Sequence, residues 1–324
     1  MATTLKTPLS QRDRIFVLET VWDRSPNDSR REEVALSTYF ARYDTLCLHR
    51  LSMLDDWSHE NIATLAKDML SLTKDACAKQ LAAIAQPATP TEQETSQILD
   101  FVARLIFCLD LVGWEPSQTL QAHLHSMFPR STQDDRYRIP RSFNLCTIAH
   151  ITDINITWTV DLNRHLQVTE DNGDIAVFHC VTVLDLFRSS ANAKQLFPAG
   201  LIDETIKSLS LMCPGENQQV KTWLRKEQRR CNEELDPRLI SLHARHKLGV
   251  AGRKIDQFDF WRDQLIIVKE VFDDREPRNI LHLWRDYRKP SQWWTFWIAL
   301  TAFLLSLIAC IEGAMQVYKA YHPS

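Results

Sequence analysis

The sequence predicts a mainly α-helical protein with a small central β-hairpin and one C-terminal transmembrane helix. Three observations lead to this fold class. Apolar residues recur at helical spacing along most of the 324 residues, the pair Asn172-Gly173 sits between alternating apolar positions, and the nineteen residues from Trp293 to Ile311 carry no charge. An uncharged apolar run of about 18 or more residues is long enough to cross a bilayer as a helix.

Residues 1–128 are expected to form an N-terminal helical region. A Ser or Thr followed three positions later by Glu is typical of a helix N-terminus, because the two side chains satisfy free amide groups of the first turn. This signal predicts a helix from Ser29 to about Leu54 and a second capping box at Thr91. Ser58 can cap a helix that runs through Leu70 to Ala85, Gln86–Pro90 is a break, and apolar residues predict a helix over 98–112. Charges at Asp100, Arg104 and Asp110 make the last helix a core helix and not a second span.

The polar, proline-flanked stretch 129–141 is the predicted linker to a central α+β region at 142–254. Phe143–Ile151 and Thr157–Leu166 are apolar enough for helices, and alternation around Asn172-Gly173 within His165–Cys180 is a strong hairpin signal. Two helices before a hairpin is the order of a winged helix, and an ordinary α+β region is the alternative that we favour. With a net charge of −3, we expect no nucleic-acid partner.

Further helices are expected at Leu201–Met212, Gln218–Arg230 and Arg238–Leu248, followed by a long juxtamembrane helix at 255–290. In this helix Phe258, Trp261, Leu265, Val268 and Phe272 recur every three or four residues. Two heptads are too few to define a coiled coil, and Pro277 interrupts them. We therefore expect this apolar stripe to pack within its own domain, and pairing with a second copy or an unknown protein partner is the alternative.

The predicted transmembrane helix spans 293–315, before a short tail at 316–324. Nineteen residues rise about 28 Å as a helix, close to the ~30 Å core of a bilayer. Aromatic rings that prefer the headgroup zone stand at both ends, at Trp293, Trp294, Trp297 and Tyr318. Glu312 lies at the far boundary, where it can reach the interface.

Basic residues predict the orientation. Arg285, Arg288 and Lys289 precede the span, whereas few basic residues follow it, so the positive-inside rule leaves the N-terminal part in the cytosol. The sequons at Asn27 and Asn155 would then stay unmodified. Because the N-terminus has no apolar h-region, we expect single-pass, post-translational insertion as a tail anchor. The sequence does not indicate which membrane.

Composition argues against several enzyme classes. Only seven glycines occur, and GxGxxG, GxxxxGK[ST], GxSxG and HExxH are all absent, so no phosphate cradle, catalytic elbow or zinc helix is predicted. The eight cysteines are scattered without a CxxC pair, which favours reduced thiols over disulfides or a zinc site. We therefore expect no cofactor, no metal and no catalytic residues.

A basic segment is the main candidate binding surface. Residues 221–254 hold ten Lys or Arg and four Asp or Glu, a surplus of six positive charges. Each base close to an anionic leaflet contributes about 1 kcal/mol, so the segment could hold the domain against lipid. The alternative is an ordinary solvated helix face. The predicted anionic-lipid patch comprises Arg225, Lys226, Arg229, Arg230, Arg245 and Lys247.

Four motifs resemble a large family of fungal membrane proteins: INITWTVDLNRHLQ at 154–167, FDFWRDQL at 258–265, LWRDYRKP at 283–290 and GAMQVYKAY at 313–321. The resemblance covers roughly 140–324 and implies membrane attachment, without an established activity. Some members lie beside secondary-metabolite gene clusters, so an accessory role in such a pathway is one alternative.

A distant similarity to CorA-like magnesium channels implies a second alternative, homo-oligomeric cation transport with Glu312 at the pore mouth. This chain departs from that pattern because it has one predicted span and no Gly-Met-Asn signature, the nearest residues being Gly313-Ala-Met315-Gln316. The function that we favour from the sequence is a membrane-anchored cytosolic domain that works as a binding or scaffolding module.

Overall fold

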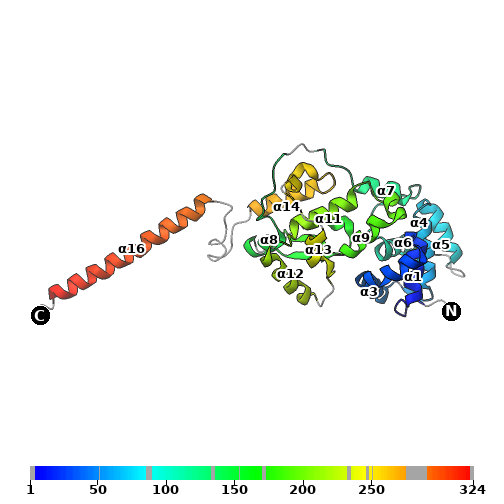
Figure 1. The fold of residues 1–324 in the computed structure, drawn as a ribbon, viewed down its shortest axis with the longest axis horizontal. Helices are drawn as coiled ribbons and strands as arrows, with labels where there is room; N and C mark the ends of the chain where they lie inside the picture. Colours follow the sequence, from blue (N-terminus) through cyan, green and yellow to red (C-terminus); the bar gives the residue numbers. More distant parts are fainter. Residues whose placement is uncertain are drawn as a thin grey trace.

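A computed structural model describes residues 4–321 except 51, 85–89, 133–135, 153, 170–172, 232–234, 246–247, 250 and 275–289. The protein is mainly helical with a small two-stranded sheet and one long apolar C-terminal helix, so the predicted fold class is confirmed. Figure 1 shows the helices packed into one body, with the C-terminal helix drawn apart from it.

The N-terminal helices begin at polar caps. Ser58 and Thr91 form capping boxes at the starts of two helices, as predicted. The expected cap at Ser29 is wrong, since Ser25 caps that helix and Ser29 is buried inside it; Pro26 at the first helical position starts the helix one turn earlier. The helices are α1 Gln11–Trp22, α2 Pro26–Ala35, α3 Ser37–Leu48, α4 His59–Met69, α5 Lys74–Ile84, α6 Glu92–Ile106 and α7 Leu120–Met127, with a 3₁₀ turn at Ser52–Leu54.

Helix α6 is a core helix, as predicted. Its inner face buries Ile98, Leu99, Val102, Leu105 and Ile106, which recur every three to four residues. On its outer face the Arg104 guanidinium pairs with the carboxylates of Asp100 and Asp110, at 3.0 Å each. These charged side chains therefore lie at the edge of the core and are paired there. This arrangement lets a strongly apolar segment form a core helix of the body.

The central sheet differs from the predicted hairpin. Strand β1, Ile156–Thr159, pairs in parallel with β2, Ile175–Phe178, so the predicted helix at Thr157–Leu166 is wrong at its start. Alternating β-branched and aromatic side chains favour an extended backbone there. The chain does turn back before β2, with an antiparallel bridge between Val168 and Ile175 and with Gly173 at φ 67°. Asn172 lies outside the described residues.

The second half of the body is again helical. The predicted helices at 143–151, 201–212 and 218–230 are present, the first of them beginning at Leu145. The elements are α8 Leu145–Thr152, a 3₁₀ turn at Leu162–Arg164, α9 Val181–Ser189, α10 Ala191–Leu196, α11 Leu201–Met212, α12 Gln218–Arg230, α13 Arg238–Arg245 and 3₁₀ turns at Ala251–Arg253 and Ile255–Gln257.

The predicted continuous helix at 255–290 is corrected in its first part. Helix α14, Arg262–Asp274, begins seven residues after the predicted start at residue 255. A 3₁₀ turn at Ile255–Gln257 and the extended residue Phe258 precede it. Its apolar stripe packs inside the body, because Trp261, Leu265, Val268 and Phe272 are all buried in the common core. Packing within the same domain is therefore confirmed for the described part of the stripe, and 275–289 lie outside the described residues.

The described part of the predicted linker, 129–141, is hydrogen-bonded to the rest of the protein. The amide of Ile139 donates to the carbonyl of Arg253 at 2.8 Å, and the amide of Ile255 donates to the carbonyl of Tyr137 at 3.0 Å. Ile139 itself is buried. One hydrophobic cluster runs from Leu5 to Phe272, so the regions on either side of this segment share a core.

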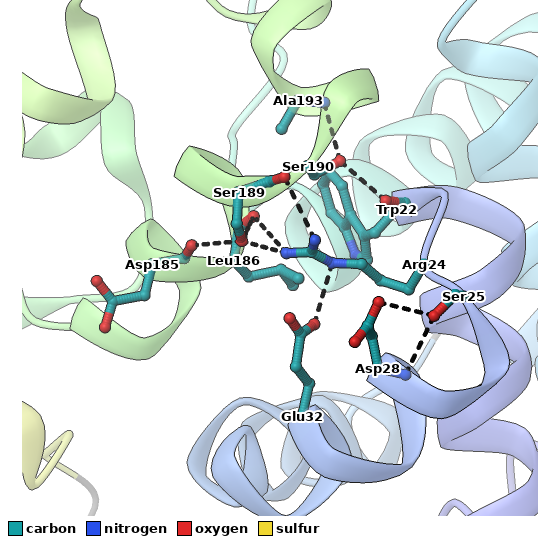
Figure 2. A network of polar contacts seen from close by, with 10 residues as sticks. All are labelled: Trp22, Arg24, Ser25, Asp28, Glu32, Asp185, Leu186, Ser189, Ser190 and Ala193. Carbon is teal, nitrogen blue, oxygen red and sulfur yellow. Dashed lines mark hydrogen bonds and ion pairs between the residues drawn. The ribbon is translucent and has the colours of Figure 1, made fainter.

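Arg24, just after α1, ties the N-terminal helices to α9 (Figure 2). Its guanidinium pairs with the Glu32 carboxylate at 3.0 Å and donates to the carbonyl and hydroxyl oxygens of Ser189. Beside it the Ser190 hydroxyl donates to the carbonyl of Trp22 at 3.0 Å. Burial raises the pKa of Glu32, which Arg24 opposes. This joint is polar and partly exposed, and it links residues that are more than 150 positions apart in the chain.

The last element is α16, Pro290–Tyr321. Within it Trp294–Tyr318 is long and apolar enough to cross a membrane; its most apolar 18 residues have a mean hydropathy of 2.1, and none of them is buried. A helix this apolar with no protein packed around it, among the described residues, exposes a surface suited to lipid rather than to water.

Candidate functional site

A pocket of about 300 Å³ opens where α11 leads into α12. This volume lies in the range of small-ligand sites. Three arginines line it, Arg138, Arg141 and Arg253, and they come from two segments that are more than a hundred residues apart in the chain. The pocket therefore exists only because the chain folds these segments together.

Arg253 is the buried arginine of the pocket, with 7% of its surface exposed. Its Nη1 donates to the carbonyl oxygen of Pro140 at 3.0 Å, which fixes the guanidinium in place. Burial lowers the pKa of Arg253, and the positive charges of Arg141 and Arg138 lower it further, while Glu216 raises it. Arg253 therefore lies in a region where neighbouring arginines already make the potential positive.

Arg138 and Arg141 stand at the rim and are exposed. Arg138 faces Lys254 in an antiparallel bridge, so its backbone is held beside the turn that carries Arg253. Within the described part of the chain, neither the Arg138 nor the Arg141 guanidinium has a hydrogen-bond or ion-pair partner. Both remain able to bind an anion.

The opposite wall comes from the start of α12. Asn217 is the N-cap, and its side chain accepts from the amide of Gln219 at 2.9 Å. The positive end of the helix dipole therefore faces this side of the pocket. Among the described lining residues, Glu216 supplies the one acidic side chain, and Pro214 and Leu248 supply apolar wall. These described residues hold three cations and one anion, a surplus of two positive charges.

Helix α12 also carries much of the predicted lipid patch. Its inner face buries Val220, Trp223 and Leu224, which turns the basic residues outward. Arg225, Lys226 and Arg229 are exposed, as the prediction requires. Arg230 is exposed too, but it pairs with Glu227 at 2.6 Å and is partly neutralised. The side chain of Arg245 and the whole of Lys247 lie outside the described residues. Arg253, which belongs to the same basic segment, is buried and lines the pocket instead of a solvated face.

The predicted membrane-interface residues are described only in part. Trp294 and Tyr318 are exposed on α16, and Trp297 is half-buried. Trp293 lies within α16 although its side chain is not among those described, and Arg285, Arg288 and Lys289 fall outside the described residues. The aromatic residues at both ends of the apolar stretch thus belong to a single helix.

Glu204 fixes the start of α14. Its carboxylate accepts from the amides of Asp259, Phe260 and Trp261 at 2.8, 2.8 and 2.7 Å. Burial raises the pKa of Glu204, and these three bonds oppose that shift. The Trp261 indole donates to the Thr205 hydroxyl at 2.9 Å. Hydrogen bonds from the FDFWRD motif, at 258–263, to Glu204 and Thr205 therefore hold the start of α14 against α11.

Buried histidines serve the fold. The Nε2 of His165 lies 2.7 Å from the Ser208 hydroxyl and its Nδ1 accepts from the amide of Phe178. Burial lowers the pKa of His165 to about 3, and that of His179 to about 4. Both rings are neutral at physiological pH and bonded on both sides or packed. Among the described residues no group of three His, Cys, Asp or Glu could hold a metal ion.

Sequence reasoning missed the arginine pocket. Arg138 and Arg141 were assigned to the predicted linker, and Arg253 to a solvated basic face. A signal was present in the four charges Arg136, Arg138, Arg141 and Arg253 close to Pro140 and Gly252, but spacing alone does not bring 138–141 beside 253. Comparison of the chain with protein-family models, curated proteins and solved structures finds no match. The resemblance to fungal membrane proteins and to CorA-like channels stays a prediction.

Proposed function

We propose that this protein is a membrane-anchored binding module. Helix α16 spans the bilayer once, the body up to residue 274 lies on the cytosolic side, and the exposed basic face of α12 contacts anionic lipid. The observation that carries the proposal is α16 itself: its most apolar 18 residues have a mean hydropathy of 2.1, and none of them is buried.

Two features of the chain support the arrangement. Aromatic side chains stand at both ends of the apolar stretch, where amphipathic rings are stabilised. Basic residues also cluster before α16 and few follow it, which favours a cytosolic body. On α12 the three exposed bases Arg225, Lys226 and Arg229 would add about 1 kcal/mol each near an anionic leaflet.

Truncation tests the anchor. A variant that ends at Gln292 should move to the soluble fraction, whereas the full chain should stay in the membrane pellet through high-salt and alkaline washes. Circular dichroism of the soluble variant serves as the folding control. If the folded truncated protein still pellets through both washes, α16 is not the anchor.

The two sequons test the orientation. Asn27 and Asn155 are both exposed, so a lumenal body would present them to the glycosylation machinery. We expect no mass change on glycosidase treatment of protein from eukaryotic cells, and a clear change when a reporter sequon is placed after Tyr321. Glycosylation of Asn27 or Asn155 would show that the body lies on the lumenal side, which would contradict the proposed orientation.

Cation transport is the competing proposal from the resemblance. Glu312 is the one acidic or basic residue in Trp294–Tyr318, and it is exposed on α16. A ring of Glu312 side chains would require a homo-oligomer, so a strictly monomeric mass in mild detergent would eliminate it. The arginine-lined pocket does not favour the third alternative, an accessory to a lipophilic biosynthetic pathway, because such a role calls for an apolar cavity.

A further inference from the structure

The pocket between 138–141, α11–α12 and Arg253 carries more positive charge than its own residues neutralise. Of the described residues that line its volume of about 300 Å³, three are arginines, and among these described residues Glu216 is the one with an acidic side chain. Unlike the bases on the outer face of α12, Arg253 is buried, so its charge is poorly screened by solvent. A surplus of two charges in such a place favours a bound dianion.

The arginines are held in position before any ligand arrives. The 137–139 segment pairs with 253–255 through two backbone hydrogen bonds, which sets Arg138 beside Arg253. The bond from Arg253 Nη1 to Pro140 uses one of five guanidinium N–H groups and leaves others for a ligand. Because the binding geometry is largely preformed, little ordering entropy opposes binding.

The chemistry of the lining selects the class of anion. Guanidinium groups match phosphate oxygens in geometry and bind them in bidentate fashion. The N-terminal end of α12, capped by Asn217, adds the favourable end of a helix dipole. A single carboxylate would neutralise one of the two surplus charges, whereas a phosphomonoester neutralises both near pH 7. The cavity is also larger than a lone phosphate and has apolar wall at Pro214 and Leu248.

We infer that this pocket binds a phosphomonoester, with Arg138, Arg141 and Arg253 as its direct ligands. The group could belong to a soluble metabolite or to a lipid headgroup. The pocket lies near the point where the body leads towards the membrane, since Phe143, two residues after Arg141, contacts the ring of Phe272 in the last turn of α14 at 5.7 Å.

The experiment uses the full chain in neutral detergent micelles and follows its thermal unfolding midpoint. The probes are inorganic phosphate, with sodium chloride at matched ionic strength, and micelles that contain phosphatidic acid, with phosphatidylserine at matched charge. Phosphatidic acid carries a phosphomonoester, whereas the phosphate of phosphatidylserine is a diester. A ligand that binds only the folded state raises the midpoint in a saturable way.

The variants separate the pocket from general positive charge. Arg138→Gln and Arg141→Gln alter exposed side chains, and each should weaken binding about tenfold, because a charge-assisted hydrogen bond is lost. Arg30→Gln with Arg31→Gln is the matched control, since it removes two exposed charges from α2 that belong neither to the pocket nor to the basic face of α12. This control should leave the affinity for either probe within about twofold.

The outcomes decide both the proposal and the source of the phosphate. Saturable stabilisation by inorganic phosphate that the pocket variants weaken supports a soluble ligand, and stabilisation by phosphatidic acid over phosphatidylserine supports a headgroup. The proposal is overturned if neither probe stabilises the full chain, or if the pocket variants and the α2 control lose affinity equally. Because the chain stays in micelles throughout, these results do not depend on the anchoring proposed above.

Discussion

Replacing Glu204 by Gln should loosen α14 from the body, because the Glu204 carboxylate binds three consecutive amides at the start of that helix. The glutamine has nearly the same shape, so the change is electrostatic and not steric. One oxygen of the amide can still accept from Phe260 and Trp261. Its nitrogen is a donor, and it would face the amide of Asp259, which is also a donor.

The size of the effect follows from these contacts. A hydrogen bond to a charged group contributes about 1.5–3 kcal/mol. Losing the bond from Asp259 and weakening the other two should lower the unfolding free energy by about 2–4 kcal/mol. At roughly 2–4 °C per kcal/mol for a body of this size, the midpoint should fall by about 4–16 °C.

The assay is thermal and denaturant unfolding of the full chain in neutral detergent, with hydrogen exchange to locate the change. Amides of α14 should lose protection first, because their cap is the group altered. Asp203→Asn is the matched control: Asp203 is adjacent but exposed and pairs with the exposed Arg188. Exposed pairs contribute little, so this variant should shift the midpoint by less than about 2 °C. Equal shifts for the two variants, or unchanged α14 protection in Glu204→Gln, would refute the reasoning.

Two further predictions concern the joint between the halves and the buried histidines. Arg24→Ala should lower the unfolding free energy by about 1–3 kcal/mol in denaturant titrations. The change leaves the half-buried Glu32 carboxylate without this partner and removes the hydrogen bonds to Ser189. Acidification should also destabilise the body. Since burial lowers the pKa of His165 to about 3 and of His179 to about 4, the unfolded state binds more protons between pH 6.5 and those values. The unfolding free energy should fall by up to about 1.4 kcal/mol per pH unit per histidine in that window.

Each of these has its own control and contrary result. Arg30→Ala, at an exposed position of α2, should change stability by less than about 0.5 kcal/mol, and an equal effect of Arg24→Ala would show that the joint contributes nothing specific. For the histidines, the slope of stability against pH should become shallower in His165→Gln. A wild-type unfolding free energy that is flat from pH 6.5 to 4.5 would contradict the assignment of neutral, buried rings.

Much of the chain could be predicted from local patterns. The helix caps at Ser58 and Thr91, the core nature of α6 and the apolar length of α16 depend on residues within a few turns of one another, and sequence records such relations directly. The same local logic failed at Thr157–Thr159, where apolarity predicted a helix. There β2 supplies hydrogen-bond partners for the backbone of these residues, and they form a strand.

The sequence by itself determined that this protein has a helical body and one helix suited to a membrane, since composition and periodicity fix what each segment can bury. Only the tertiary structure decided which charges act together. Arg253 was one base among ten in a segment that looked solvated, until the pairing of 253–255 with 137–139 buried it beside Arg138 and Arg141. A Coulomb interaction depends on distance and on exclusion of water, and neither quantity is written in the order of residues along the chain.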